Sequence, residues 1–170
     1  EFDGGAAFMN QGIHTIDLLL HLMGDVKSVY GNMKTLVHAI ECEDVGTGIL
    51  NFNNGAIGTI TAGTALFPGY PERLEIYGDK GSILMEGGNI KEWNVPGVPA
   101  PANTSLKGNA SGAADPTNIG HLNHKIVLED MIGAIQENRP PMVDGFEARK
   151  AVEVITALYR SSDEERLIFL

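Results

Sequence analysis

The sequence predicts an α+β domain, in which helices pack on one face of a mostly antiparallel open sheet of about six strands. Three observations support this class. Helical spacing of apolar residues recurs in residues 8–23, 120–138 and 145–161. Short alternating runs occupy most of residues 26–93. The turns between these runs are too short for the crossover that a parallel pair needs, so neighbouring strands should be antiparallel.

The composition indicates one globular domain with a core, because 43% of the 170 residues are hydrophobic and 20% are charged. The formal net charge of −10 disfavours nucleic acid, whose phosphates need clustered Lys and Arg, and it also disfavours an anionic membrane surface. Cys42 is the single cysteine, so no internal disulfide can form and a reducing, cytoplasmic location is expected. Its neighbours Glu41 and Glu43 disfavour a reactive thiolate.

The first helix is expected over residues 8–23, where Ile13, Ile16 and Leu20 recur at helical spacing. Gly24 follows this run and suits a helix C-cap, because glycine readily adopts the left-handed conformation found there. The helix should therefore end at the residue before Gly24.

Strands are expected next, beginning with residues 26–37, which alternate imperfectly. Residues 45–52 and 56–65 flank Asn53-Asn54-Gly55, and an Asn-Gly pair supplies the positive φ angles of a tight turn. These two runs should therefore form a hairpin. Further short strands are predicted at 71–78, 82–85 and 90–93.

A long loop is predicted for residues 94–118, which contain four prolines among Gly, Ala, Asn and Ser. Loops of this length in a compact domain are usually functional or mobile. The following helix, residues 120–138, carries Leu128, Ile132 and Ile135 on one stripe.

The last helix is expected over residues 145–161, with Asp144 as its N-cap. Residues 167–170 should close the fold as an edge strand. The buried stripe of the last helix is predicted to comprise Ala148, Val152, Ile155 and Tyr159.

Three polar side chains share one side of the first helix, since Asn10, His14 and Asp17 follow one another at spacings of four and three. Histidine is well matched to proton transfer near neutral pH, and a carboxylate one turn away can orient it. An asparagine one turn earlier can hold a substrate hydroxyl. The pattern predicts a site that removes a proton from an alcohol, with His14 and Asn10 as catalytic residues and Asp17 as a substrate-binding residue.

Other interpretations of these residues stay open. The face can be an ordinary polar helix surface with a hydrogen-bonded histidine. It can also ligate a metal through His14, Asp17 and His21, but residues seven apart lie two turns apart, so we expect no metal site. His121 and His124 begin the next helix, either as exposed first-turn residues or as substrate-binding residues that approach when the long loop closes.

Three segments carry a resemblance: D-G-G-A-A-F-M-N-Q-G-I-H-T-I-D-L-L from Asp3, E-I-Y-G-D-K-G-S-I from Glu75, and E-D-M-I-G-A-I-Q-E-N-R-P-P-M-V-D-G-F-E-A-R-K-A-V-E from Glu129. Together they resemble the C-terminal domain of the glucose–fructose oxidoreductase, inositol dehydrogenase and MocA family. The segment from Asp3 resembles the family's Gly-rich turn into its catalytic helix. The segment from Glu75 is similar to its strand–turn–strand, and the segment from Glu129 to its C-terminal helix pair.

The resemblance implies a two-domain enzyme that oxidises or reduces a hydroxyl of a sugar or cyclitol. Residues 1–170 would be a single C-terminal substrate and oligomerisation domain, whose sheet packs into a homo-oligomer. An N-terminal Rossmann domain would bind NAD or NADP and supply a catalytic lysine. Because the chain begins at Glu1 without a methionine, we expect that domain to be missing from this polypeptide. Alone, the chain should bind no NAD(P) and should be inactive.

The resemblance also implies roles for single residues. The family's catalytic histidine matches His14, and its frequent acidic residue one turn later matches Asp17. Its partner acid matches Asn10, which is a departure, and His121 or His124 is expected to close over the sugar. Two alternatives follow: a non-catalytic binding or oligomerisation module of the same fold, or a family member that uses transient oxidation for glycoside cleavage or elimination.

Overall fold

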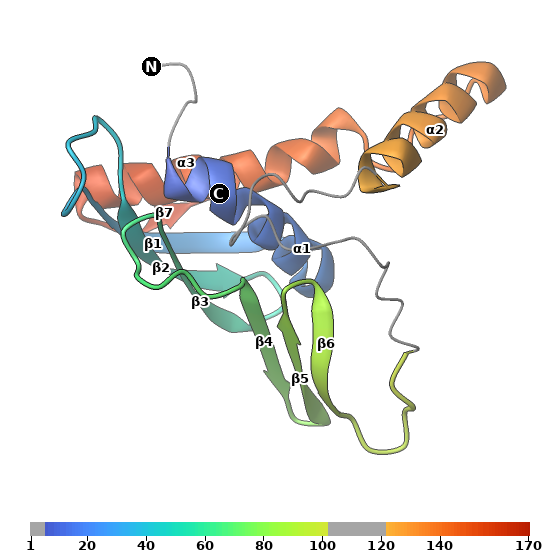
Figure 1. The fold of residues 1–170 in the computed structure, drawn as a ribbon, viewed down its shortest axis with the longest axis horizontal. Coiled ribbons are helices and arrows are strands. Elements are labelled where there is room, and N and C mark those ends of the chain that lie inside the picture. The colour runs from blue at the N-terminus through green and yellow to red at the C-terminus, as the bar shows by residue number, and fades with distance from the viewer. Residues whose placement is uncertain (1–5, 102–121) are drawn as a thin grey trace. The chain divides into compact units, whose positions relative to one another are not determined.

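The computed structural model describes residues 6–101 and 122–170, which form two compact units. One unit comprises Glu1–Phe67 and Val143–Leu170, and the other Pro68–Met142. The elements of the first unit are η1 (Ala7–Gly12), α1 (Ile13–Met23), β1 (Val26–Lys34), β2 (Val45–Phe52), β3 (Ile57–Gly63), α3 (Gly145–Glu164) and β7 (Ile168–Phe169) (Figure 1). Those of the second are β4 (Arg73–Gly78), β5 (Gly81–Glu86), β6 (Asn89–Asn94) and α2 (Leu122–Glu137).

The predicted α+β class and antiparallel pairing are confirmed, and the strands divide between two sheets. The first sheet has four strands in the order β3-β2-β1-β7, and the second has three in the order β4-β5-β6. Every pair of neighbours is antiparallel. The division falls where Pro68 and Pro71 interrupt the run of strands, because proline cannot donate a ladder hydrogen bond.

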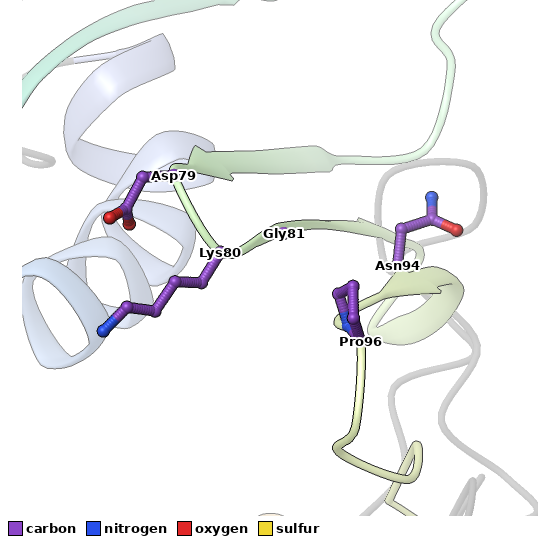
Figure 2. A pocket seen from close by; sticks show the side chains of 5 residues that line it. All are labelled: Asp79, Lys80, Gly81, Asn94 and Pro96. Atoms are coloured by element: carbon purple, nitrogen blue, oxygen red, sulfur yellow. The ribbon is translucent and has the colours of Figure 1, made fainter.

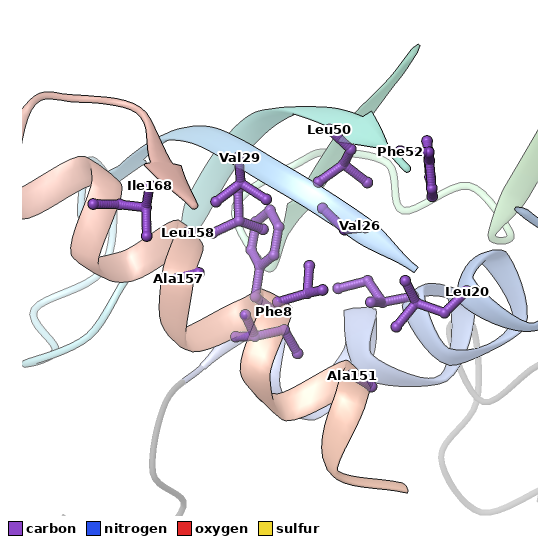
Figure 3. Close-up of a cluster of buried hydrophobic side chains, with 13 residues drawn as sticks. Phe8, Leu20, Val26, Val29, Leu50, Phe52, Ala151, Ala157, Leu158 and Ile168 are labelled. Carbon is purple, nitrogen blue, oxygen red and sulfur yellow. The ribbon is translucent and has the colours of Figure 1, made fainter. Parts of the chain in front are cut away.

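The core of the first unit lies between its sheet and its helices. Along β2, Gly48, Leu50 and Phe52 are buried whereas Thr47 and Ile49 are exposed, so the sheet presents one face to the core. Helix α3 packs on β1, and η1 packs on β2 and β3 (Figure 1). The buried cluster shown in Figure 3 includes fully buried side chains from η1, α1, β1, β2 and α3, among them Phe8, Ile16, Val29, Leu50, Ile155 and Leu158.

The predicted hairpin between β2 and β3 is confirmed, but its turn differs from the expected one. Within the turn only Gly55 has a positive φ, of 89°. Its N–H donates to the carbonyl of Phe52 at 3.1 Å, and the Phe52 N–H donates to Ala56 at 2.9 Å. This is a three-residue loop that ends in a left-handed glycine, and Asn54 instead stabilises it by accepting from the N–H of Ala56.

Helix α3 begins as predicted, because the Asp144 carboxylate accepts hydrogen bonds from the N–H groups of Phe146 and Glu147. The predicted stripe is correct for Ile155, which is fully buried, and for Tyr159, which is partly buried against the core, but it is wrong for Ala148 and Val152, which are exposed. The apolar residues of this helix form two adjacent rows, and the sequence alone does not indicate which row meets the sheet. The buried row comprises Ala151, Val154, Ile155, Ala157, Leu158 and Ser161.

Helix α2 confirms the predicted penultimate helix, although its described part begins at Leu122. Its stripe residues Leu128, Ile132 and Ile135 are exposed. Of the predicted long loop, residues 102–118 lie outside the described residues.

Candidate functional site

The segment that carries Asn10 and His14 is not one continuous α-helix. Residues Ala7–Gly12 form a π-helical turn, and the α-helix begins only at Ile13. The α-helical geometry that aligns residues three and four apart therefore holds for His14 and Asp17, whereas Asn10 precedes the junction. Single π turns within helices occur frequently at functional sites. This segment is thus a place where backbone geometry, as well as side chains, is unusual.

The polar side chains of this segment face away from the core. Asn10, His14 and Asp17 are exposed, while Ile16 and Leu20 on the other side are buried. In residues 6–101 and 122–170, no side chain forms a hydrogen bond or ion pair with Asn10, His14 or Asp17. The structure therefore brings the three predicted residues onto one accessible helical segment, with their hydrogen-bonding groups available to a ligand.

Of the two other predicted histidines, only His124 lies in the described part of the second unit. His124 is exposed in α2, and His121 lies outside the described residues. Their predicted role as substrate-binding residues stays a prediction.

A buried acid beside this segment was not predicted. Glu43 is only 6% exposed, and its Oε1 accepts hydrogen bonds from the Phe8 N–H and the Tyr159 hydroxyl, both at 2.9 Å. Burial, followed by the hydrogen bond to Glu43, raises the pKa of Tyr159, so its hydroxyl stays protonated at neutral pH. The sequence contained one signal for this acid. Glu43 and Asp44 directly precede an apolar strand, so one of them could be buried, and a buried carboxylate needs a hydrogen-bond partner.

An open hollow in the second unit contains none of the predicted site residues. It is formed by the β4–β5 turn and the end of β6, with Lys80 as its one basic side chain (Figure 2). The lining residues are Asp79, Lys80, Gly81, Asn94 and Pro96.

Among the residues that the structure describes, no three His, Cys, Asp or Glu side chains are grouped so that they could hold a metal ion. Within the same part of the chain, no helix is both long enough and apolar enough to cross a membrane.

Comparisons with known proteins give consistent matches. The chain matches the GFO/IDH/MocA C-terminal domain over residues 1–84. Myo-inositol 2-dehydrogenase from Thermotoga maritima is 26% identical over 173 residues, covering 98% of this chain and 49% of that protein. D-apiose dehydrogenase from Rhizobium rhizogenes is 35% identical over 89 residues, covering 50% of this chain and 26% of that protein.

A solved structure also matches nearly the whole chain. The WlbA dehydrogenase from Bordetella pertussis, in complex with NADH and UDP-GlcNAcA, has a TM-score of 0.78 at 30% identity, covering 98% of this chain and 46% of that one. The chain thus spans about half the length of the relatives it matches. The predicted resemblance is confirmed: the chain is similar to the C-terminal domain of the GFO/IDH/MocA family, whose model matches residues 1–84.

Proposed function

We propose that this chain is the substrate-binding and catalytic-helix domain of an NAD(P)-dependent oxidoreductase that acts on a hydroxyl of a sugar or cyclitol. The observation that carries the proposal is the family match over residues 1–84, which include the exposed face with Asn10, His14 and Asp17. The names of its relatives support it, since they are dehydrogenases of inositol and of the sugar D-apiose.

We place this domain in the C-terminal half of the parent enzyme. In the described part of the chain all strands pair antiparallel, so the parallel βαβ unit that binds a dinucleotide is lacking there. NAD(P) would therefore be bound by a Rossmann domain elsewhere in the parent, and this polypeptide alone would be inactive. The WlbA dehydrogenase, which was solved with NADH, is about twice as long as this chain and supports that division.

The chemistry assigned to this chain is the movement of a proton. In the oxidation direction His14 removes the proton of the substrate hydroxyl, and no side chain of the described residues is bonded to its exposed imidazole. Asn10 and Asp17 hydrogen-bond neighbouring hydroxyls and hold the reacting carbon in place. A substrate-binding role for His121 or His124 is kept as part of the proposal. A nicotinamide held by the Rossmann domain of the parent would supply the hydride acceptor for the carbon whose hydroxyl loses the proton.

The proposal is tested by His14→Ala in the full-length protein. Loss of a general base should lower kcat by about 10²- to 10⁴-fold without changing cofactor affinity. His21→Ala is the matched control, because His21 is an exposed histidine on the same helix to which no role is assigned. Hydride transfer is followed by nicotinamide absorbance across a panel of polyols and sugars. Full turnover in His14→Ala would refute the assignment of the base.

The amide side chain of Asn10 is the feature that favours other functions. The resemblance places an acid at this position, and an amide cannot serve as its ionised partner for His14. A binding or oligomerisation module would bind substrate without oxidising it. A member that uses transient oxidation would release a cleaved glycoside or an eliminated product with no net change in NAD(P)H, and product analysis distinguishes the three cases.

We also propose that the chain forms a homo-oligomer through the open face of its four-stranded sheet. That face carries threonines and exposed apolar side chains. The exposed apolar residues are Tyr30, Ile49, Ile57 and Phe169. The net charge of −10 gives no support for a nucleic acid or an anionic membrane as an alternative partner.

A further inference from the structure

The π turn that carries Asn10 begins without a local cap. Its N-cap residue is Ala6, which has no side-chain hydrogen-bonding group, and no side-chain cap is formed there. The first N–H groups of any helix lack an intrahelical partner, and a buried N–H without a partner destabilises the fold. Phe8, in the first turn, is completely buried, so its N–H must find a partner within the protein.

Glu43 supplies that partner from 35 residues away in the sequence. The same oxygen, Oε1, accepts the Phe8 N–H and the Tyr159 hydroxyl. One atom therefore joins the start of η1, the residues that precede β2, and helix α3. Because Glu43 is buried, water competes poorly for these bonds and the loss of one leaves a costly unpaired group.

The ring of Phe8 is held as closely as its amide. A Cβ atom added to Gly46 on β2 would meet Sδ of Met33 and would lie 2.7 Å from Cε2 of Phe8, so the Phe8 ring and Met33 together fill the space that a side chain at Gly46 would occupy. Phe8 is thus fixed at its ring by the sheet and at its backbone by Glu43. Asn10 follows two residues later and His14 six residues later, in the same continuous helical segment.

We propose that Glu43 and Tyr159 are positioning residues for the Asn10–His14 face: they fix the start of the π turn and so the orientation of both side chains toward substrate. This inference rests on the proposed function of His14. Neither residue touches the substrate. Their effect passes through the Phe8 amide, and a displacement of about 1 Å at a reacting group can lower the rate about 100-fold.

The experiment compares Tyr159→Phe, Glu43→Ala and Glu43→Gln in the full-length protein. Glu43→Gln keeps a side-chain oxygen that can accept both bonds, so it is the conservative rescue. Tyr70→Phe and Glu41→Gln are matched controls, because both residues are exposed and form no side-chain hydrogen bond in the described parts of the chain. The readouts are kcat and KM, cofactor affinity, melting temperature and the hydrogen-exchange rate of the Phe8 amide.

We expect Glu43→Ala and Tyr159→Phe to lower kcat by about 10- to 100-fold, with cofactor affinity unchanged. Phe8 amide exchange should be faster in both, and Glu43→Gln should restore most of kcat. A purely structural pair would lower the melting temperature while the kcat of the folded protein stayed the same, which would overturn the proposal. Unchanged exchange at Phe8 would overturn it too.

The two proposals fail in different ways. If turnover is absent, or is the same with and without His14, the proposed function fails. The positioning role then fails with it, even if Glu43 anchors Phe8. If turnover depends on His14 but not on Glu43 or Tyr159, only the positioning role fails.

Discussion

Asp44 holds together the segment between β1 and β2. Its buried carboxylate accepts the N–H groups of Leu36, Val37 and His38 at 2.7–2.8 Å, and the His38 ring lies 3.3 Å away. These bonds explain why β1 ends at Lys34 and not at the predicted residue 37, since the next N–H groups bind the side chain instead of a strand. The bonds to His38 and then Leu36 lower the pKa of Asp44 from 3.8 to about 2.

Asp44→Asn should therefore destabilise the protein in a pH-dependent way. A carboxyl whose pKa is lower in the folded state stabilises that state above its unfolded pKa, and this contribution is lost as the pH falls toward the folded value. The difference in unfolding free energy between wild type and variant should have its maximum value above about pH 4 and should decrease toward pH 2. Urea denaturation at a series of pH values measures it.

Asp163→Asn controls for the loss of one negative charge, because Asp163 is exposed and its side chain forms no hydrogen bond or ion pair within the described residues. A difference for Asp44→Asn that is constant from pH 7 to pH 2 would contradict the assignment.

At the scale of single residues, the sequence predicted what local spacing can encode. It placed His14 and Asp17 on the exposed side of a helix, opposite Ile16 and Leu20, and the structure has them there. It did not predict Glu43, whose partners lie 35 and 116 residues away in the chain. It also missed the π turn, because the apolar spacing of this segment fits an α-helix equally well. The catalytic role of His14 and the substrate-binding role of Asp17 stay predictions.

At the scale of elements, glycines decide how closely α3 approaches the sheet. A Cβ atom at Gly31 would lie 2.7 Å from the backbone oxygen of Leu158, and one at Gly48 would lie 2.6 Å from its Cδ2 atom. Strand β7 pairs only with Ser28 and Val29 of β1. Helix α3 provides hydrogen-bond acceptors for the next part of this edge, since the hydroxyls of Ser161 and Ser162 accept from the N–H groups of Gly31 and Met33 at 3.0 and 2.9 Å. Such an edge would otherwise present unpaired N–H groups to solvent.

Gly31→Ala should lower the free energy of unfolding by about 1–3 kcal/mol, because the added methyl group meets a backbone carbonyl that moves only with the helix. Gly145→Ala is the matched control. Nothing lies within 4 Å of a Cβ atom there, and the first position of α3 suits alanine, so stability should be unchanged or rise by at most about 1 kcal/mol. Urea denaturation measures both variants. Equal stabilities of Gly31→Ala and wild type would show that α3 shifts at little cost.

The elements themselves were largely predictable, while their buried faces were less so. Strand β2 has the predicted bounds, and β3 and α3 begin within a residue of them, because turn residues and Asp144 are strong local signals. The predicted buried stripe of α3 was wrong at Ala148 and Val152, because the row that meets the sheet depends on Gly31 and Gly48, whose effect appears only when the sheet forms. The division into two sheets likewise depends on a segment with two prolines, which in the sequence resembles any other connection between strands.

At the scale of the whole molecule, the two faces of the four-stranded sheet differ in the part of the chain that the structure describes. Helices η1 and α3 pack on the core face, whereas Tyr30, Ile49 and Ile57 are 43%, 49% and 80% exposed on the other. Tyr30 pairs with Ile49, and Ile49 with Thr59, so these side chains form one continuous surface across three strands. A surface of this kind suits a second copy of the chain, because a two-fold axis brings the same surface of both copies together and so buries the exposed apolar side chains of each.

Ile49→Glu should break such an assembly. A two-fold contact would bring two added carboxylates together, and like-charge contact costs several kcal/mol, so the dissociation constant should rise by about two orders of magnitude or more. Val152→Glu is the matched control, since Val152 is 40% exposed on α3, which covers the other face of the sheet. Sedimentation velocity of the full-length protein at several concentrations measures both. An Ile49→Glu protein that sediments like wild type, or a wild type that is monomeric throughout, would rule out this face as the interface.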